Sequence, residues 1–379
     1  MFPKLRFKEF DGDLTESKLV ELTSWASGGT PAKDVPEYWG DGIPLISGAS
    51  MHTNQLYESD VKITKLGLQK GSKLALKDSI LILVRGSMLF NKIPMGITLG
   101  DVAFNQDVKC IRPKQQLAPL FLFQWLHAKE NTIQNKVTAT GIGAGKLDTA
   151  DLQNLKLYKP SLEEQTKIAT FLSAVDEKIS QLTQKHQLLR EYKQGMMQKL
   201  FSQQVRFKAD DGSEFGEWDQ LKFKDVIKIK YGKDHKKLDD GDIPVLGTGG
   251  VMRYVDSYLY EGESILIGRK GTIDKPRFIS GKFWTVDTLF YTEIGENILP
   301  KFAFQQLLLV NWLNLNEATG VPSLNTTSIG NIELKVPCLA EQTKIANVLS
   351  AIDQKIEVVS KQIEQAKQWK KGLLQQMFI

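Results

Sequence analysis

The chain has 379 residues, of which 41% are hydrophobic and 25% charged, a composition typical of globular proteins that leaves room for two or three domains. Its net charge of +5 is too small for bulk charge alone to hold a polyanion, so a nucleic-acid surface would have to be a local cluster of Lys and Arg. The chain has two cysteines without metal-ligand spacing, which predicts neither a disulfide framework nor a zinc site. Its N-terminal stretch lacks the apolar run of a signal peptide, and no stretch approaches the roughly 18 apolar residues of a membrane span. We therefore expect a cytoplasmic protein without membrane contact.

The first part of the chain is predicted to form an α+β domain, which we bound at 1–155. An Ile-Pro strand pattern lies at 42–48, and a β-rich apolar run at 78–86 ends in an Arg and a Gly. An apolar stretch near 120–127 is expected to be a helix. Short strands, glycine turns and one apolar helix together are typical of the α+β class.

A glycine cluster at 140–146 invites comparison with a nucleotide-binding loop, but its spacing excludes that class of site. Only three residues separate Gly141 from Gly145, whereas a P-loop has four between its glycines. Leu147 also stands where a P-loop needs Ser or Thr to bind magnesium. We therefore expect a turn here.

Residues 156–204 are predicted to form a central spacer helix. Apolar residues recur there at alternating spacings of four and three over about five heptads, which is the pattern of a coiled-coil seam. Ser161 and Glu164 have the spacing of a capping box. His186 and Lys193 occupy two seam positions, so we expect imperfect helix pairing there. The predicted pairing residues are Ile168, Leu172, Val175, Ile179, Leu182 and Leu189.

The second half of the chain repeats the first. A second α+β domain is predicted at 205–335, with an Ile-Pro pattern at 242–248 and an apolar run at 263–271 that ends in Arg, Lys and Gly. A C-terminal spacer helix is predicted at 336–379, with Lys370 interrupting its seam. Its pairing residues are Ile345, Leu349, Ile352, Ile356, Val359 and Ile363.

Both spacer segments begin with the same six-residue motif, which we call the repeated phrase. Glu-Gln-Thr-Lys-Ile-Ala occurs at 164–169 and 341–346, and the prolines that open the two segments, Pro160 and Pro337, are 177 residues apart. This offset far exceeds a solenoid repeat of roughly 20 to 50 residues and equals a whole domain with its connector. The fold class we predict is α+β: two tandem α+β domains separated by two long antiparallel coiled-coil helices, in a pseudo-two-fold repeat.

No constellation of residues predicts catalysis or metal binding. The sequence has no Asn-Pro-Pro-aromatic segment for adenine methylation and no cluster of carboxylates with a Lys that would indicate a nuclease. The histidines lack partners at triad or metal-ligand spacing. They are His52, His127, His186 and His235. We expect a non-catalytic chain that binds no metal or cofactor itself.

These segments resemble the specificity subunit of type I restriction-modification systems. The resemblance rests on the repeated phrase, the segment 28–44 with its Thr-Pro and Tyr-Trp, the Arg-Gly after an apolar strand, and the Asn-Gln-Asp at 105–107. It covers essentially the whole chain in the family's order of domain, helix, domain, helix. The second domain departs from the pattern at 231–240, which lacks both Thr-Pro and Tyr-Trp, so family contacts are not carried over there.

The resemblance implies a function. Each domain would be a target recognition domain that reads one half of a bipartite, asymmetric site in double-stranded DNA. The helices would set the half-site spacing and dock two modification (methyltransferase) subunits, and restriction (motor-nuclease) subunits would join the complex. S-adenosylmethionine, ATP and magnesium would be used by those partners, in DNA methylation and bacterial defence.

The candidate DNA contacts are basic and polar side chains near the matched strands and turns. Arg can donate a bidentate fork to guanine or phosphate, and a neighbouring glycine lets the backbone come close, although a structural ion pair is the alternative for any one Arg. The lysines at 233–237 would track phosphates unless they only form a solvated face. The candidates are Ser47, Ser50, His52, Arg85, Ser87, Lys92, Lys146, Lys233, His235, Lys236, Thr248, Arg253, Arg269, Lys270 and Thr272.

Apolar helix residues outside the seam are expected to face partner subunits. They are Phe171, Met197, Phe201, Trp369 and Phe378. Two rival functions stand beside DNA recognition. One is a two-headed protein-binding scaffold without DNA specificity, and the other is a self-sufficient methyltransferase or nuclease, against which the missing motifs count.

Overall fold

Two long helices contribute to both structural units of the chain. The computed structural model describes residues 3–141 and 143–378. Met1 and Phe2 of the N-terminal stretch, Ile142 of the glycine cluster and Ile379 at the end of the predicted C-terminal helix lie outside the described residues. One unit is Met1–Leu182 with Gln362–Ile379, and the other is Thr183–Lys361. Helices α6 (Leu162–Phe201) and α10 (Leu339–Met377) each pass from one unit into the other.

The main sheet of the first unit is built on the apolar run predicted at 78–86. Strand β7 (Ile80–Leu83) is buried throughout and pairs antiparallel with β11 (Val108–Pro113) and β9 (Met95–Thr98). The sheet order is β2-β11-β7-β9-β4, and the smaller sheets are β5-β3-β10-β6, β12-β13-β8 and β1-β14. The other strands are β1 (Thr15–Lys18), β2 (Thr23–Ser27), β3 (Trp39–Ile46), β4 (Gln55–Leu56), β5 (Lys62–Ile63), β6 (Lys73–Ala75), β8 (Arg85–Gly86), β10 (Val102–Phe104), β12 (Thr138–Ala139), β13 (Gly145–Lys146) and β14 (Lys156–Lys159). The short helices are α1 (Leu19–Leu22), α2 (Lys65–Gly71), α3 (Pro119–Ala128), α4 (Glu130–Gln134) and α5 (Thr149–Gln153).

The second unit repeats the same sheet core. Its six-stranded sheet has the order β16-β21-β19-β20-β17-β18, in which the first four strands correspond to β2-β11-β7-β9 of the first unit. The β15-β22 pair likewise corresponds to β1-β14. The strands are β15 (Asp219–Lys222), β16 (Ile227–Tyr231), β17 (Ile243–Gly247), β18 (Gly250–Val255), β19 (Tyr260–Gly268), β20 (Arg277–Thr285), β21 (Leu289–Ile294) and β22 (Glu333–Val336). The short helices are α7 (Phe223–Val226), α8 (Pro300–Leu307) and α9 (Thr326–Gly330).

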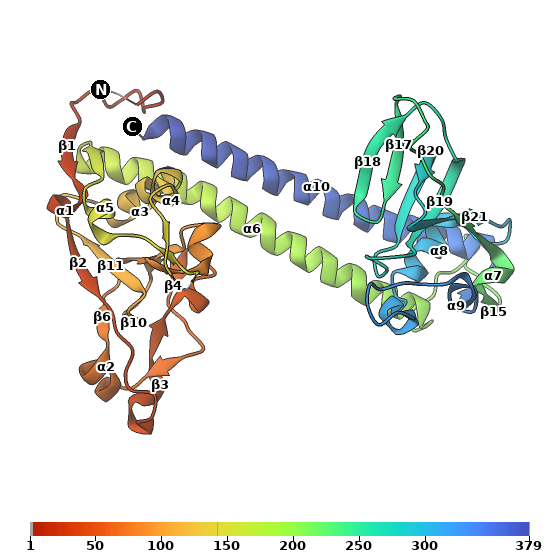
Figure 1. Cartoon of the computed structure of the whole chain (residues 1–379), viewed down its shortest axis with the longest axis horizontal. Helices are drawn as coiled ribbons and strands as arrows, with labels where there is room; N and C mark the ends of the chain where they lie inside the picture. Colours follow the sequence, from red (N-terminus) through yellow and green to blue (C-terminus); the bar gives the residue numbers. More distant parts are fainter. Residues whose placement is uncertain (1–2, 142, 379) are drawn as a thin grey trace. The chain divides into compact units, whose positions relative to one another are not determined.

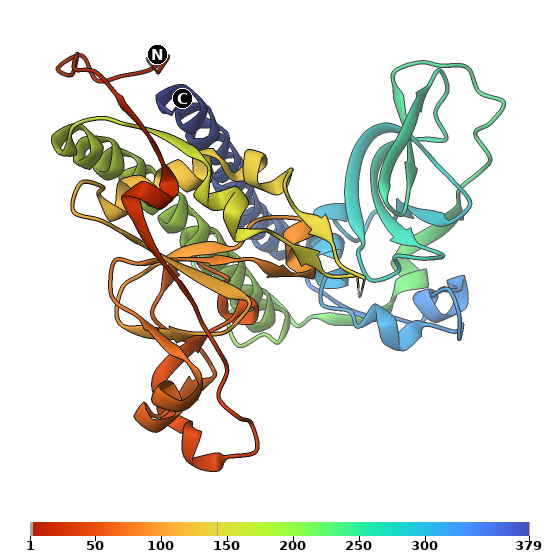
Figure 2. The same ribbon diagram turned by 60° about the vertical axis from the view of Figure 1, so that its left-hand side comes forward.

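The predicted fold class is confirmed, since each unit mixes helix and sheet and the long helices pair antiparallel. In the first unit the start of α6 packs against the end of α10 (Figures 1 and 2), and in the second unit the end of α6 packs against the start of α10. The segment 156–159, which the sequence boundaries assign to the spacer, forms strand β14 before α6 begins. None of the helices in the described part of the chain has the length and apolar character needed to cross a membrane.

The lysines expected to interrupt the seam form ion pairs between the helices. In the first unit Lys370 of α10 lies 2.5 Å from Asp176 of α6, and in the second Lys193 of α6 lies 2.7 Å from Asp353 of α10. Both lysine side chains are only 12% exposed, so their charges need these carboxylates. The lysines are therefore accommodated in the seam as ion pairs, and the expectation of imperfect helix packing near them stays a prediction.

A glutamine from each domain joins the same carboxylates. Gln124 of α3 donates to Asp176 at 2.7 Å, and Gln305 of α8 donates to Asp353 at 2.9 Å. One aspartate thus bonds α6, α10 and the domain together in each unit.

All the predicted helix-pairing residues are buried or half-buried: Ile168, Leu172, Val175, Ile179, Leu182, Leu189, Ile345, Leu349, Ile352, Ile356, Val359 and Ile363.

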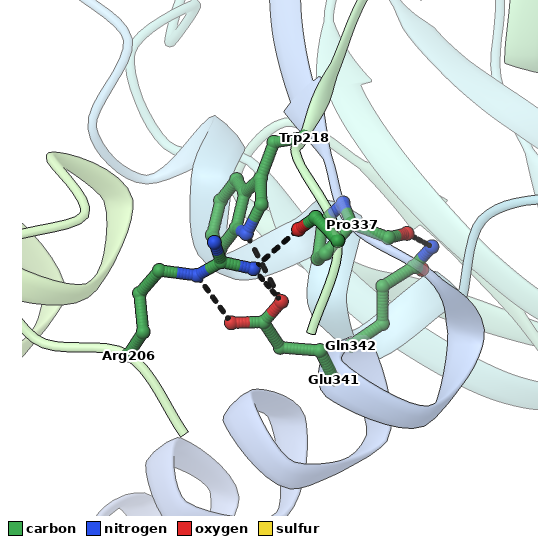
Figure 3. Close-up of polar contacts among 6 residues, drawn as sticks. Arg206, Trp218, Pro337, Glu341 and Gln342 are labelled. Carbon is green, nitrogen blue, oxygen red and sulfur yellow. Dashed lines mark hydrogen bonds and ion pairs between the residues drawn. The ribbon is translucent and has the colours of Figure 1, made fainter. Parts of the chain in front are cut away.

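The repeated phrase at the start of each long helix attaches the helix to its own domain. Figure 3 shows fully buried Glu341 accepting hydrogen bonds from the Arg206 guanidinium and the Trp218 indole. The hydrogen bonds from Arg206 to Glu341 raise the pKa of the Arg206 guanidinium above its ordinary value. Gln342 donates to the carbonyl of Pro337 at 2.8 Å, which fixes the turn into the helix.

The first unit repeats this attachment. Arg6 donates to both carboxylate oxygens of Glu164 at 2.7 Å, and Gln165 donates to the carbonyl of Pro160 at 2.9 Å. The backbone N–H of Glu164 donates to Ser161 Oγ at 3.3 Å, so this half of the predicted capping box forms. The other half does not, because the Glu164 carboxylate binds Arg6.

Most apolar residues expected to face partner subunits lie inside the units. Met197 and Phe201 are 5% and 8% exposed and belong to the core of the second unit. Phe171 and Phe378 are half-buried against the core of the first unit, whereas Trp369 is 54% exposed. The prediction is wrong for the first four because each long helix is covered by its domain as well as by the other helix, which widens its apolar face beyond the seam.

Candidate nucleic-acid interface

Two basic residues face each other at the end of the central strand in the first unit. β8 pairs antiparallel with β13, which places Arg85 directly opposite Lys146. Both residues are exposed, and within the described residues neither side chain forms an ion pair with a carboxylate. Like charges directly opposite on paired strands repel each other, and no described carboxylate compensates this pair. Gly86, at φ +144°, permits the turn that presents Arg85.

The second unit builds the same ribbon with different residues. Lys270 forms a bridge with Ser323, and the Gly271 N–H donates to the Pro322 carbonyl at 2.8 Å. Gly271, at φ +88°, takes the place of Gly86. The structural counterpart of Arg85 is therefore Lys270, and the counterpart of Lys146 is Ser323.

Arg269 has a different position from Arg85. Its backbone N–H donates to the Thr288 carbonyl at 2.8 Å, as that of Val84 donates to the Asp107 carbonyl at 2.8 Å. Its guanidinium donates to the carbonyl of Asp287 at 3.2 Å and lies 5.4 Å from the ring centre of Tyr231. Part of its hydrogen-bonding capacity is thus used inside the unit.

A hollow of about 850 Å³ lies next to this ribbon in the second unit. The segments 234–236, 247–252 and 286–288 line it, so it gathers the predicted residues His235, Lys236 and Thr248. The ribbon adjoins the hollow, because a Cβ added to Gly271 would lie 3.7 Å from Thr248 Oγ1.

The first unit has an equivalent hollow of about 550 Å³. It is lined by segments that include 30–33, 45–47 and 105–106, and it contains the predicted residue Ser47. A neighbouring hollow of about 800 Å³ contains Ser50 and His52.

Matching backbone hydrogen bonds show that these hollows correspond. The N–H of Asn105 donates to the Ile46 carbonyl at 3.0 Å, as that of Val286 donates to the Leu246 carbonyl at 3.1 Å. The strand before each hollow ends in a glycine for a steric reason. A Cβ on Gly28 would lie 2.1 Å from the Phe104 carbonyl oxygen, and one on Gly232 would lie 2.0 Å from that of Val286.

The remaining predicted DNA-contact residues lie outside the two hollows. Ser87 is exposed at the start of the 3₁₀ helix Ser87–Phe90, and Lys92, Lys233 and Thr272 are exposed in irregular segments. Arg253 is bound to the Asp240 carboxylate at 2.6 Å and to the Leu238 carbonyl at 3.1 Å, which favours the structural alternative for this residue. Sequence reasoning missed Ser323 and the strand pairing that brings Lys146 to Arg85, because pairings between distant segments leave no local periodicity.

Comparisons with a family profile, with related sequences and with a solved structure all indicate the same family. The sequence profile described as Type I restriction modification DNA specificity domain matches residues 12–190 and 216–368. The chain is 26% identical to the type I restriction enzyme MjaVIII specificity subunit of Methanocaldococcus jannaschii, over 97% of this chain and 94% of that protein. It is 29% identical to the EcoR124I/EcoR124II specificity subunit of Escherichia coli, over 48% of this chain and 45% of that protein. The fold is similar to that of a type I restriction-modification S subunit from M. genitalium, with a TM-score of 0.68 and 19% identity over 100% of this chain and 99% of that one.

Proposed function

The chain belongs to the type I restriction-modification DNA specificity family, as a specificity subunit, and from that premise we propose that each of its units reads one half of a bipartite site in duplex DNA. The observation that carries the proposal is the duplicated site. Each unit has a hollow beside a two-stranded ribbon that presents a basic residue, Arg85 in one and Lys270 in the other. Because these basic residues differ and the loops around them differ, the two half-sites are expected to differ in sequence.

The long helices are proposed to dock methyltransferase subunits. Their exposed apolar residues support this, since Leu188 and Tyr192 of α6 lie four residues apart and are 56% and 57% exposed. Val358 and Trp369 of α10 are each 54% exposed. In this proposal S-adenosylmethionine, ATP and magnesium act in the modification and restriction subunits, and this chain contributes recognition and spacing without catalysis.

Methylation mapping tests the proposal directly. The chain is expressed with its modification subunit in a host without other methyltransferases, and methylated positions are mapped over the genome. The expected result is one asymmetric sequence made of two parts with a fixed gap. A methylated sequence in one continuous part would contradict the assignment of one half-site to each unit.

Salt dependence of DNA binding separates this function from that of a protein-binding scaffold. A chain that contacts phosphates loses affinity for duplex DNA linearly on a logarithmic scale as salt rises. A scaffold without DNA contacts shows no measurable binding to random duplex at low salt. That outcome would reject the proposed function.

A further inference from the structure

A short turn lies at the same place in both units. A backbone hydrogen bond closes it as a four-residue β-turn, at 105–108 with 3.3 Å in the first unit and at 286–289 with 3.0 Å in the second. Gln106 and Asp287 are the second residues of these turns, so each is the structural counterpart of the other. Both residues are exposed, and each lines the hollow of its own unit.

The turn is bonded to the ribbon that presents the basic residue. The residue after Gln106 accepts a backbone hydrogen bond of 2.8 Å from the residue before Arg85. The residue after Asp287 accepts one of 2.8 Å from the residue before Lys270. Each unit thus places a basic residue, which suits a phosphate, close to a neutral or acidic one, which suits a phosphate less well. A base edge is therefore the DNA contact that fits the turn residue.

The Gln106 side chain is held by two neighbours and keeps one donor and one acceptor. Thr30 Oγ1 donates to Gln106 Oε1 at 2.7 Å, and Gln106 Nε2 donates to Asp107 Oδ2 at 3.5 Å. A side-chain amide has two acceptor lone pairs and two N–H donors. One lone pair and one N–H therefore remain, and these are the groups with which Gln binds N6 and N7 of adenine in the major groove.

The Asp287 side chain offers acceptors alone. In the described part of the chain its carboxylate has no hydrogen bond and no ion pair. The other carboxylate of the hollow, that of Asp234, instead accepts from the backbone N–H of Lys236 at 3.1 Å. The Arg269 guanidinium donates to the Asp287 carbonyl at 3.2 Å, so it fixes the backbone of the turn and leaves the carboxylate unused.

We propose that Gln106 and Asp287 each read one base, Gln106 an adenine in the first half-site and Asp287 a cytosine in the second. The proposal rests on the proposed DNA-recognition function and names the base contact of each hollow. A carboxylate accepts from the N4 amino group of cytosine and is repelled by the acceptors of the other bases, which are O6 and N7 of guanine, O4 of thymine and N7 of adenine. The amide and the carboxylate at one structural position thus account for two different half-sites.

The test is selection from a randomised duplex library by the full-length chain with its modification subunit. Wild type is compared with Gln106→Glu, Asp287→Asn and Glu296→Gln. Glu296 is exposed beyond the end of β21 that lies away from Asp287, so its variant makes the same change in net charge outside the hollow. It serves as the matched control.

Each variant in a hollow is expected to change one position of one half-site. Gln106→Glu should lose a preference of about tenfold for an A·T pair in the first half-site, and Asp287→Asn should lose a similar preference for a G·C pair in the second. The other half-site should stay unchanged in each case, and Glu296→Gln should keep both preferences. Because both side chains are exposed, the urea midpoints of the variants are expected to equal that of the wild type.

Several results would overturn the proposal. Unchanged preferences in both variants would do so, as would an effect in one unit only, because the two positions are proposed to be equivalent. Equal weakening on all sequences would indicate a backbone contact or, with a lower urea midpoint, a structural role. Loss of preference at a G·C pair for Gln106→Glu, or at an A·T pair for Asp287→Asn, would contradict the assigned bases.

The wild-type selection separates this inference from the function on which it rests. If the wild-type chain selects no sequence in two parts, the proposed function is rejected. If it selects such a sequence and the variants select the same one, only the two base contacts are rejected.

Discussion

Glu164 and Glu341 occupy the same position in the repeat but differ in the number of side chains that donate to them. Glu341 accepts from Arg206 and from the Trp218 indole, whereas in the described residues Arg6 is the side chain that donates to Glu164. Both carboxylates are nearly inaccessible, at 2% and 0% exposure. The two attachments therefore depend to different degrees on their arginines.

Arg6→Ala is expected to destabilise the first unit by about 3 to 5 kcal/mol, because it leaves a buried carboxylate unpaired. Arg206→Ala is expected to cost the second unit less, since Trp218 still donates to Glu341. Urea titration followed by hydrogen exchange at β1-β14 and at β15-β22 measures the two losses separately. Adding Trp218→Phe to Arg206→Ala should bring the loss close to that of Arg6→Ala. Equal losses in the two single variants would show that the indole contributes nothing.

Arg85→Ala and Lys270→Ala are expected to act on different half-sites. If each residue reads a base edge, its loss weakens specific binding by about 1 to 3 kcal/mol and relaxes one half-site only. Selection from a randomised duplex library gives the preference at each position. Equal weakening on cognate and random DNA would mark a phosphate contact, and no weakening on either would remove the ribbon from the interface.

The two helix-to-helix ion pairs are equally spaced along both long helices. Asp176 and Lys193 are 17 residues apart in α6, as are Asp353 and Lys370 in α10. Both pairs form because these separations agree. The helices are thus matched in length as well as in seam pattern.

Four residues inserted into α6 alone, between Asp176 and Lys193, are expected to prevent both ion pairs from forming at once. The loss of one buried pair should lower the urea midpoint clearly, whereas the same insertion in both helices restores equal separations. We expect the double variant to recover most of the stability and to prefer a longer gap between half-sites, by about 6 Å of helix rise. An unchanged gap in the double variant would refute the role of the helices in spacing.

The sequence allowed the helices to be predicted better than the site. Heptad spacing is local, so the seams and the repeated phrase were visible in the residues themselves. The role of the repeated phrase was not visible in the sequence, because Glu341 binds Arg206, which is 135 positions away. The same reason hid the pairing of Arg85 with Lys146 and led to Lys370 being taken for an interruption, since its partner Asp176 is 194 positions away.

At the scale of the whole molecule, the repeat makes α6 able to replace α10. The first unit uses Leu373, Leu374 and Met377 of α10 in its core, and the second uses Met197 and Leu200 of α6 in corresponding positions. A second copy of α6 therefore presents similar apolar side chains to the first unit. It also presents Lys193 where α10 presents Lys370.

Residues 1–202 are accordingly expected to form a homodimer in which Lys193 of each copy pairs with Asp176 of the other. Such a dimer is two-fold symmetric and, with the modification subunit, should methylate an interrupted palindrome made from the first half-site. Sedimentation and methylation mapping measure both properties. Lys193→Ala serves as a control that should weaken dimerisation. A monomeric fragment in the presence of the partner, or asymmetric methylated sites, would contradict the equivalence of the helices.

The division of the first unit between two distant chain segments has a consequence for its synthesis on the ribosome. Its core needs Leu373 and Met377, whereas the second unit is one continuous segment, Thr183–Lys361. At about 5 to 20 residues per second, roughly 10 to 40 s pass between the emergence of Leu182 and that of Met377. The second unit is therefore complete first, and during that interval the nascent first unit lacks the α10 side chains that cover one face of α6. Protection of this helix face during translation is thus a requirement set by chain order, independent of the stability of the finished fold.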